Sequence, residues 1–342
     1  MSVESASPQT KQPNVGAASG STGGSALAKV LGGGRQYGTV FLLAILILVF
    51  ALTAEAFFTW TNFKSILITQ TVIACMTLGV MLPLIVGEFD LSVGYMVGFI
   101  SMLGAYLAGH DWAVLPILLV MLGVGALIGF INSVLIDRTH ISSFIATLGV
   151  GIILQGFTQG LSGGSVLTQN IPRVVIDIGR KYAGPVSISV WITLALIIVL
   201  FYVLEHTPLG RSWYAIGGSE KVSFLAGLRT KRLKSLAFAL GGLLVGVGAI
   251  FALGQNGSAS PSFGPELLLP AYAGAFLGVT TYKGGYYNVI GSIVGILVLA
   301  VGFNGLSLLG VPFWIQPVFN GSVLLAAVLA ARAETRKVRV GS

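Results

Sequence analysis

The sequence predicts an all-α membrane protein, a polytopic bundle of about ten transmembrane helices. Hydrophobic residues make up 55% of the 342 residues and charged residues only 9%, which is more apolar surface than a soluble domain of this length buries. Ten apolar runs occur along the chain, and most approach the ~20 residues that cross a hydrocarbon core. They lie at about 37–52, 65–86, 91–108, 113–136, 143–161, 187–204, 236–254, 267–280, 289–306 and 311–331.

The distribution of basic residues gives the orientation of these spans. Ten spans place both termini on the same side of the membrane. With the N-terminus in the cytoplasm, fifteen Lys and Arg residues lie inside and four lie outside, which is the bias that cytoplasmic segments show. We therefore expect both termini in the cytoplasm, with a disordered tail at 1–36, a transmembrane domain at 37–331 and a basic tail at 332–342.

Two segments depart from plain spans. The run at 267–280 is short and contains Pro270, which predicts a broken or partly re-entrant helix. The connection at 87–92 is also short, and it carries Glu88 and Asp90. The count of spans places this connection on the cytoplasmic side, and a deeper position in the membrane is the alternative.

Small residues recur at helical spacing within the predicted spans. Five pairs of glycines lie four residues apart: Gly94/Gly98, Gly125/Gly129, Gly156/Gly160, Gly242/Gly246 and Gly291/Gly295. Such pairs let helix backbones approach closely, so we expect packing contacts there, with hinges of a moving protein as the alternative. A short similarity between residues 87–94 and 283–291 is consistent with an internal repeat.

The connection at 206–234 contains six Lys or Arg residues and a helix signal in its middle. Ser219 is placed to cap a short helix, and Gly227 is placed to end it. Apolar residues then fall on one face of that helix: Val222, Leu225 and Ala226. A helix that exposes an apolar face outside the membrane is typical of a contact with another protein. A solvated basic loop is the alternative.

Several classes of chemistry lack their residues in this sequence. No G-x-x-x-x-G-K-[ST] motif occurs, so the chain has no phosphate-binding loop of its own. A single cysteine, Cys75, and three histidines scattered through connections predict neither a disulfide nor a metal site. No nucleophile and base are found that would define a catalytic site. The basic residues lie in connections and tails, which argues against nucleic acid as a partner.

Four groups of residues occur in the order and spacing of one transporter family. They are Gly87–Gly94, Phe130–Ile136 with Ile141–Gly149, Thr207–Arg211 with Tyr214–Gly218, and Asn304–Leu306. Across residues 37–331 the chain resembles the membrane permease subunits of ribose-type, monosaccharide ATP-binding cassette importers. Glu88 stands where that family usually has Gly, Ser143 where Pro is common, and Phe303 where Asn is usual. These departures bear on the solute rather than on the transport machinery.

The resemblance implies a permease of a bacterial plasma membrane that performs no covalent chemistry and binds no cofactor. Two permease copies pair with cytoplasmic ATP-binding subunits that use the ATP, and an extracytoplasmic solute-binding protein delivers a monosaccharide or similar small polar solute. The connection at 162–186 is long enough to receive that protein, and a simple exposed loop is the alternative. A self-sufficient ion-coupled carrier is the alternative function; it needs a carboxylate inside the bundle, for which only Glu88 and Asp90 are available.

The resemblance also assigns two sets of residues. Coupling to the ATPase falls to the helix in the 206–234 connection and its flanks: Gly218, Glu220, Leu225, Ala226, Gly227 and Arg229. Arg229 and its basic neighbours would meet an acidic rim of the ATPase or lipid head groups. The predicted substrate path consists of Asp90, Ser92, Asn132 and Thr147, which lie in the resembling motifs, together with Gln155 and Asn304, which are added because they are uncharged polar residues within apolar spans. Weak contacts with mostly neutral groups allow a solute to leave again. The alternatives are hydrogen bonds to neighbouring helices and, for Asp90 and Ser92, a cap of the third span.

Overall fold

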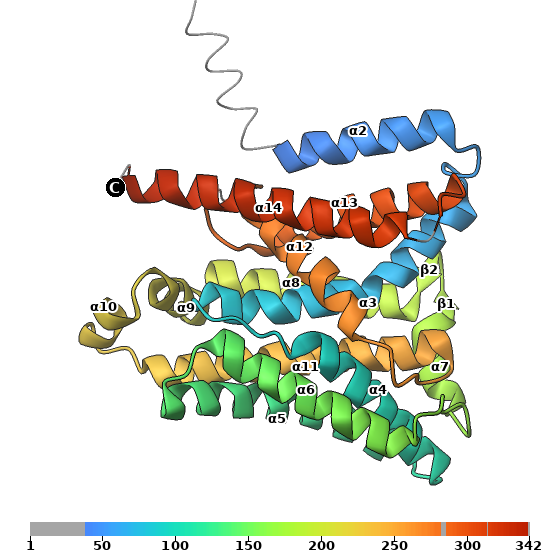
Figure 1. Ribbon diagram of the computed structural model, residues 1–342, viewed down its shortest axis with the longest axis horizontal. Helices are drawn as coiled ribbons and strands as arrows, with labels where there is room; N and C mark the ends of the chain where they lie inside the picture. The colour runs from blue at the N-terminus through green and yellow to red at the C-terminus, as the bar shows by residue number, and fades with distance from the viewer. Residues whose placement is uncertain (1–37, 282–284, 313, 341–342) are drawn as a thin grey trace, which may run out of the picture. The chain divides into compact units, whose positions relative to one another are not determined.

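The computed structural model describes residues 38–281, 285–312 and 314–340, with side chains as far as Leu329. The tail predicted at 1–36 lies outside the described residues, as do the last two residues of the basic tail. Every predicted apolar run contains a helix. These ten helices are α2 (Gly38–Thr53), α3 (Trp60–Ile85), α4 (Val93–Gly109), α5 (Val114–Thr139), α6 (Ser143–Ser162), α8 (Ile188–His206), α11 (Thr230–Asn256), α12 (Leu268–Val279), α13 (Val289–Leu308) and α14 (Ile315–Val340) (Figure 1).

The all-α class is confirmed for the described part of the chain. Six of the ten helices are long and apolar enough to cross a membrane, and α2, α4, α12 with its preceding turn, and the first part of α14 are shorter apolar helices. The described residues also include one antiparallel hairpin of two strands with two residues each, β1 (Tyr182–Ala183) and β2 (Val186–Ser187). The number of spans and their orientation stay predictions.

Local sequence sets several helix ends. Thr59 accepts a hydrogen bond from the backbone of Asn62 at 3.2 Å and so caps α3, while Asn288 accepts one from Gly291 at 2.7 Å and caps α13. Gly257 ends α11 with a φ of +64°, a backbone conformation that costs glycine little. These signals are readable without knowledge of the tertiary fold.

Pro270 does not interrupt α12. It lies in the first turn of that helix, where the missing N–H has no intrahelical partner to lose. The interruption lies before the helix instead, at the 3₁₀ turn η1 (Pro265–Leu267). The short run at 267–280 is therefore a short α-helix that follows this turn. The backbone at 263–265, where the turn begins, packs against Gly94 and Gly98 of α4.

Helix α11 packs against α5, α3, α4 and α7 (Arg173–Arg180). Glycines permit its closest approach to α5. A Cβ added to Gly242 would lie 2.0 Å from the carbonyl oxygen of Gly125, and a Cβ added to Gly129 would lie 2.1 Å from that of Phe238. The predicted pairs Gly125/Gly129 and Gly242/Gly246 thus form one backbone contact between two helices.

The remaining glycine pairs divide into two kinds. The pair Gly291/Gly295 of α13 packs on the backbone of α12 in the same manner as the α5–α11 contact. The pair Gly156/Gly160 of α6 differs, because a Cβ on either residue would meet nothing within 4 Å. Four of the five glycine pairs therefore make the predicted packing contacts within this chain. The pair on α6 makes none.

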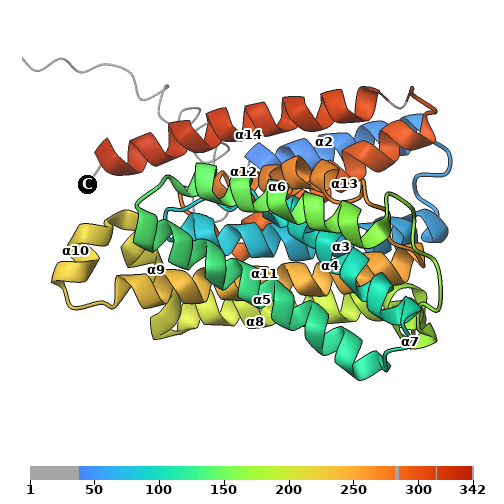
Figure 2. The ribbon, with the colours of Figure 1, turned by 60° about the horizontal axis from the view of Figure 1, so that its bottom comes forward.

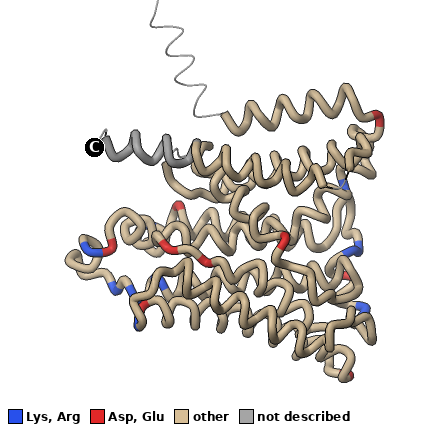
Figure 3. The backbone as a smooth tube through the Cα atoms, in the orientation of Figure 1, with Lys and Arg blue, Asp and Glu red and all other residues tan. Residues whose placement is uncertain are grey.

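Helix α14 ends toward the end of the bundle that carries α9 (Pro208–Gly218) and α10 (Glu220–Leu225), and the first turn of α2 points toward the same end, as Figure 1 and Figure 2 show. The opposite end carries α7 and the β1–β2 hairpin. Charged residues gather mainly at these two ends, with a few acidic positions between them (Figure 3). We refer to the first as the α10 end.

Candidate translocation site and coupling segment

The turn between α3 and α4, residues 86–92, is held by hydroxyl groups from two other helices. Three consecutive backbone N–H groups donate to them: Phe89 to Ser143 Oγ at 3.1 Å, Asp90 to Tyr272 OH at 3.0 Å and Leu91 to Thr147 Oγ1 at 2.9 Å. Ser143 and Thr147 lie on α6, and Tyr272 lies on α12. Non-helical backbone inside a membrane bundle needs such partners, because no water satisfies it there.

The Asp90 side chain is the centre of a second set of hydrogen bonds. Its Oδ1 accepts from Ser92 N at 3.0 Å, Ser92 Oγ at 2.5 Å and Asn132 Nδ2 at 3.2 Å. Asn132 Nδ2 also donates to Ser92 Oγ at 2.8 Å. All three side chains are buried. Because each donor bonds to a buried acceptor, the set fixes the first turn of α4 against α5.

Four of the six predicted path residues are therefore brought together. Asp90, Ser92, Asn132 and Thr147 form one buried cluster, and Asp90 accepts the hydrogen bond that starts α4 while the Ser92 side chain makes no cap bond of its own. Asn132 Oδ1 has no hydrogen-bond partner among the described residues. Gln155 lies apart from the cluster and donates to the carbonyl of Pro261 at 2.8 Å.

A cavity of about 740 Å³ lies among α3, α12, α13 and α14. Its polar lining is mostly uncharged and includes Thr69, Gln70, Asn304, Gln316 and Asn320; Glu266 is the one charged residue of the lining. Asn304 is held by a reciprocal pair of amide hydrogen bonds to Asn62, at 2.8 and 2.9 Å. Of the predicted path residues, Asn304 alone lines this cavity.

Sequence reasoning missed most of these cavity residues. Gln70, Gln316 and Asn320 carry the same signal that selected Asn304, an uncharged polar side chain in an apolar run. Gln70 lines the cavity, and its buried Oε1 has no hydrogen-bond partner among the described residues.

The coupling segment contains more helix than the sequence predicted. Helix α9 starts at Pro208 behind a Thr207 cap, and α11 starts at Thr230, before the apolar run at 236. Trp213 of α9 is buried and donates from Nε1 to the carbonyl of Leu233 at 2.8 Å. The Thr-Pro pair was the signal for α9, because both residues favour a helix start.

Tyr214 makes a second tie between α9 and the bundle. Its hydroxyl donates to the carbonyl of Tyr287 at 2.7 Å. Burial raises the pKa of the Tyr214 phenol above its ordinary value, so the hydroxyl keeps its proton and this hydrogen bond persists across the physiological pH range. Helix α9 is thus fixed to the bundle at two points.

The boundaries predicted for the short helix in this segment are confirmed. Ser219 Oγ accepts a hydrogen bond from the backbone of Val222 at 3.4 Å, and Gly227 follows α10 with a φ of +88°. Three apolar side chains of α10 are exposed: Val222 by 64%, Phe224 by 65% and Leu225 by 75%. Phe224 adds to the apolar surface predicted from Val222, Leu225 and Ala226.

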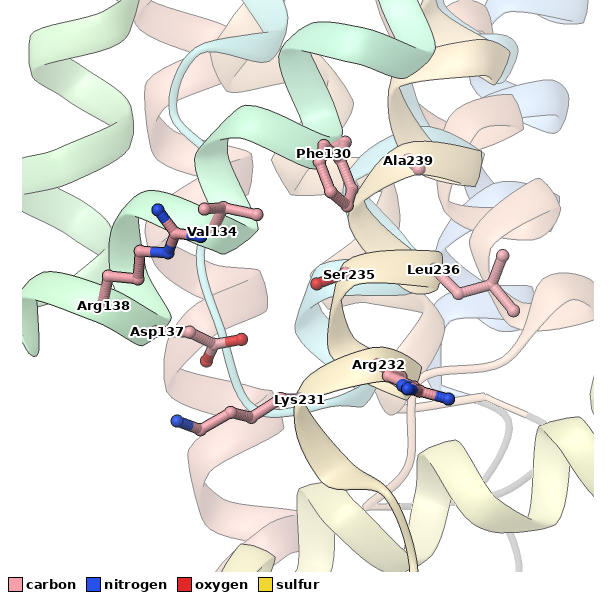
Figure 4. Close-up of a pocket in the computed structure, with 9 residues that line it drawn as sticks. All are labelled: Phe130, Val134, Asp137, Arg138, Lys231, Arg232, Ser235, Leu236 and Ala239. Atoms are coloured by element: carbon pink, nitrogen blue, oxygen red, sulfur yellow. The ribbon is translucent and has the colours of Figure 1, made fainter.

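A second cavity, of about 500 Å³, lies between α5 and α11. Figure 4 shows Asp137 on its α5 side, with the Lys231 and Arg138 side chains around it, and Phe130 and Leu236 in its apolar part. This cavity carries cations beside an apolar wall, in contrast to the amide-lined cavity at α13.

A helical bundle with six helices long and apolar enough to cross a membrane, and with a cavity that carries several neutral polar side chains, is an architecture that suits a membrane transport protein. Residues 62–328 match the family described as "Branched-chain amino acid transport system / permease component", and the chain belongs to that family. It is thus a multi-pass membrane permease component without an ATPase of its own, which confirms the resemblance and the expectation of a transport subunit.

Its curated relatives cover most of both chains. The ribose import permease protein RbsC of Escherichia coli K12 is 32% identical over 310 residues, which are 86% of this chain and 96% of that protein. RbsC of Bacillus subtilis is 32% identical over 88% of this chain and 94% of its own length. The D-allose transport system permease protein AlsC of E. coli K12 is 30% identical over 87% of this chain and 91% of its own length. No solved structure matches the chain.

Proposed function

We propose that this chain forms the translocation path of an ATP-driven importer for a monosaccharide or a similar small polar solute. The observation that carries the proposal is the cavity among α3, α12, α13 and α14, whose largely apolar wall carries several neutral hydroxyl and amide groups and one carboxylate. A sugar presents several hydroxyls, each of which donates and accepts one hydrogen bond, and amides match both functions. The relatives named for ribose and D-allose import support the same solute class.

Neutral groups suit transport better than ions. A charged site holds its ligand strongly, whereas a transported solute has to leave again. Glu266 is the one carboxylate at the cavity, and its Oε2 already accepts a hydrogen bond from Gly264 N at 3.1 Å. Asn304 is the residue proposed here to contact the solute. A contact of the solute with the buried Asp90 cluster or with Gln155 stays a prediction.

The charges at the 86–92 turn weigh against an ion-coupled carrier. Asp90 Oδ1 already accepts three hydrogen bonds, and Glu88 forms an ion pair with Lys234 at 2.6 Å. Both carboxylates thus already have structural partners within the bundle. Energy from a separate ATPase needs no site for a coupling ion, and this supports the importer over the carrier.

The contact with the ATPase is proposed to be α10 and its flanks, from Gly218 to Arg229. The exposed Val222, Phe224 and Leu225 form an apolar surface on a helix at the end of the bundle (Figure 1). The neighbouring cations Arg229, Lys231 and Arg232 are exposed and suit either an acidic rim of the ATPase or lipid head groups. The helix would seat its apolar side chains in a groove of the ATPase.

The other proposed partners use other faces. A second copy of the chain is proposed to pack on α6, where Gly156 and Gly160 leave room for a helix to approach. The solute-binding protein would meet α7 and the hairpin at the opposite end, where Arg173 and Lys181 flank Asp177 at 3.3 and 3.6 Å. Membrane lipid would cover the remaining exposed apolar faces.

Uptake of radiolabelled sugars by proteoliposomes tests the proposal. The vesicles hold this chain alone, with its ATPase, or with both the ATPase and the solute-binding protein, and ribose, allose and arabinose are the first solutes. We expect uptake only with ATP and both partners. Uptake by the chain alone under an ion gradient would refute the importer and establish the carrier.

A further inference from the structure

Lys234 contacts three carboxylates at the start of α11. Its Nζ lies 2.6 Å from Glu88 Oε1, 3.1 Å from Glu220 Oε2 and 3.7 Å from Asp137 Oδ1. The Lys234 side chain is only 5% exposed. A buried ammonium group needs anionic partners, and three partners exceed what neutralisation of one charge requires.

The three carboxylates come from three separate elements. Glu88 belongs to the 86–92 turn and is 18% exposed, and Asp137 lies in the last turn of α5 and is 13% exposed. Glu220 starts α10 and is 49% exposed. Lys234 therefore joins the exposed helix that the ATPase is proposed to contact to two segments inside the bundle.

Glu220 is the ion-pair contact of α10. Among the described residues, its bond to Lys234 is the one salt bridge between α10 and the rest of the bundle. The large apolar side chains of α10 point into solvent instead. A displacement of α10 by a partner therefore changes the surroundings of Lys234 directly.

The 86–92 turn continues the connection toward the cavity. Glu88 lies two residues before Asp90, whose backbone N–H donates to the hydroxyl of Tyr272 on α12. The ring of Phe89 stacks on the ring of Tyr272 with 6.3 Å between centroids. Pro270, two residues before Tyr272, lines the 740 Å³ cavity. Side-chain contacts, joined by two-residue steps along the chain at 88–90 and 270–272, thus lead from α10 through Lys234 to the cavity wall.

We infer that Lys234 is a positioning residue that transmits movement of α10 to the 86–92 turn. When Glu220 leaves Lys234, the ammonium group keeps Glu88 and Asp137 as its remaining partners. The two arrangements differ in how strongly Lys234 holds Glu88, and a coupling element needs two such discrete arrangements. This inference rests on the proposed function, because it assigns the displacement of α10 to the ATPase.

Parallel measurement of uptake and ATP hydrolysis in proteoliposomes with both partners tests the inference. The variants are Glu220→Gln, Lys234→Met, their combination and Lys234→Arg. Arg211→Met is the matched control, since it removes an exposed cation from the neighbouring helix α9, outside the segment proposed to contact the ATPase. Thermal unfolding and co-purification of the ATPase are recorded for each variant, because a structural role alone would change those and leave the coupling ratio intact.

We expect Glu220→Gln to lower solute transported per ATP about tenfold, the size of effect that one charge-assisted hydrogen bond supplies. Because both residues act through one contact, the double variant should lose no more than Lys234→Met alone. Lys234→Arg should recover most of the ratio, and Arg211→Met should match the wild type. Glu220→Gln keeps the inference testable even where Lys234→Met does not fold, because Glu220 is half-exposed and lies outside the bundle.

Two results overturn the inference. The first is a Glu220→Gln variant that transports as much solute per ATP as the wild type. The second is a double variant whose loss of transport per ATP equals the sum of the losses in the two single variants. Either would leave the importer proposal intact, because the wild type would still need ATP and both partners. Absence of ATP-dependent uptake by the wild type would instead refute the proposed function and the inference with it.

Discussion

The contact between α5 and α11 gives a sharp test of the fold, through the substitution Gly242→Ala. The added Cβ would lie 2.0 Å from the carbonyl oxygen of Gly125 and 2.8 Å from its carbonyl carbon. Ordinary van der Waals contact begins at 3.4 Å, so the two backbones would have to separate by about 1.4 Å. Both partners are helix backbone, and neither can turn aside as a flexible side chain would.

The expected magnitude follows from that geometry. Overpacking a tight contact costs about 1–3 kcal/mol, and a clash with helix backbone belongs at the upper end of that range. A loss of about 2–3 kcal/mol corresponds to a fall in Tm of about 4–10 °C for a protein of this size. The assay is thermal unfolding of the purified chain in detergent, followed by tryptophan fluorescence.

Gly123→Ala is the matched control, because Gly123 lies within α5 but its added Cβ would meet nothing within 4 Å. Alanine favours helix over glycine by up to about 1 kcal/mol, so this variant should unfold at the wild-type temperature or above it. An unchanged Tm for Gly242→Ala, with Gly123→Ala also unchanged, would refute the close approach of α5 and α11.

Three further substitutions test the site. Leu225→Asp places a charge on the exposed apolar face of α10 and should abolish co-purification of the ATPase while Tm stays unchanged, because Leu225 is exposed by 75%. Asn304→Leu removes an amide from the cavity and should lower sugar uptake about tenfold while the ATPase remains bound; uptake at the wild-type rate would exclude Asn304 from the path. Asp90→Ala leaves the donors of Ser92 and Asn132 without their acceptor, and we expect a loss of about 2–4 kcal/mol, measured as poor recovery of folded protein; normal recovery and Tm would contradict the buried cluster.

The elements of this fold were readable from the sequence because each depends on local properties. An apolar run near the length of a membrane crossing predicts a helix wherever its neighbours lie. The short helix α10 was equally predictable, since Ser219 caps it through its own side chain and Gly227 ends it through its own backbone. Helix α9 was missed although Thr207 and Pro208 start it by the same local rules.

The site was less readable because it depends on which face of each helix meets which neighbour. Spans that are apolar all round carry no periodicity to say where an amide points, so Asn304 was selected and Gln70, Gln316 and Asn320 were not. Lys234 was one of six cations in a connection, and its burial depends on Glu88, which lies far away in the sequence. Contacts of that kind appear only once the helices are assembled.

The hydroxyl groups that hold the 86–92 turn have a consequence for how this sequence can vary. Ser143, Thr147 and Tyr272 bind the main chain of residues 89–91, and main-chain N–H groups are common to every residue except proline. The hold on the turn is therefore independent of the side chains at positions 88, 89 and 91. Those positions can acquire new side chains while the three main-chain hydrogen bonds stay in place. The arrangement lets one permease scaffold accept different residues at this turn, Glu88 among them, without a new way of anchoring it.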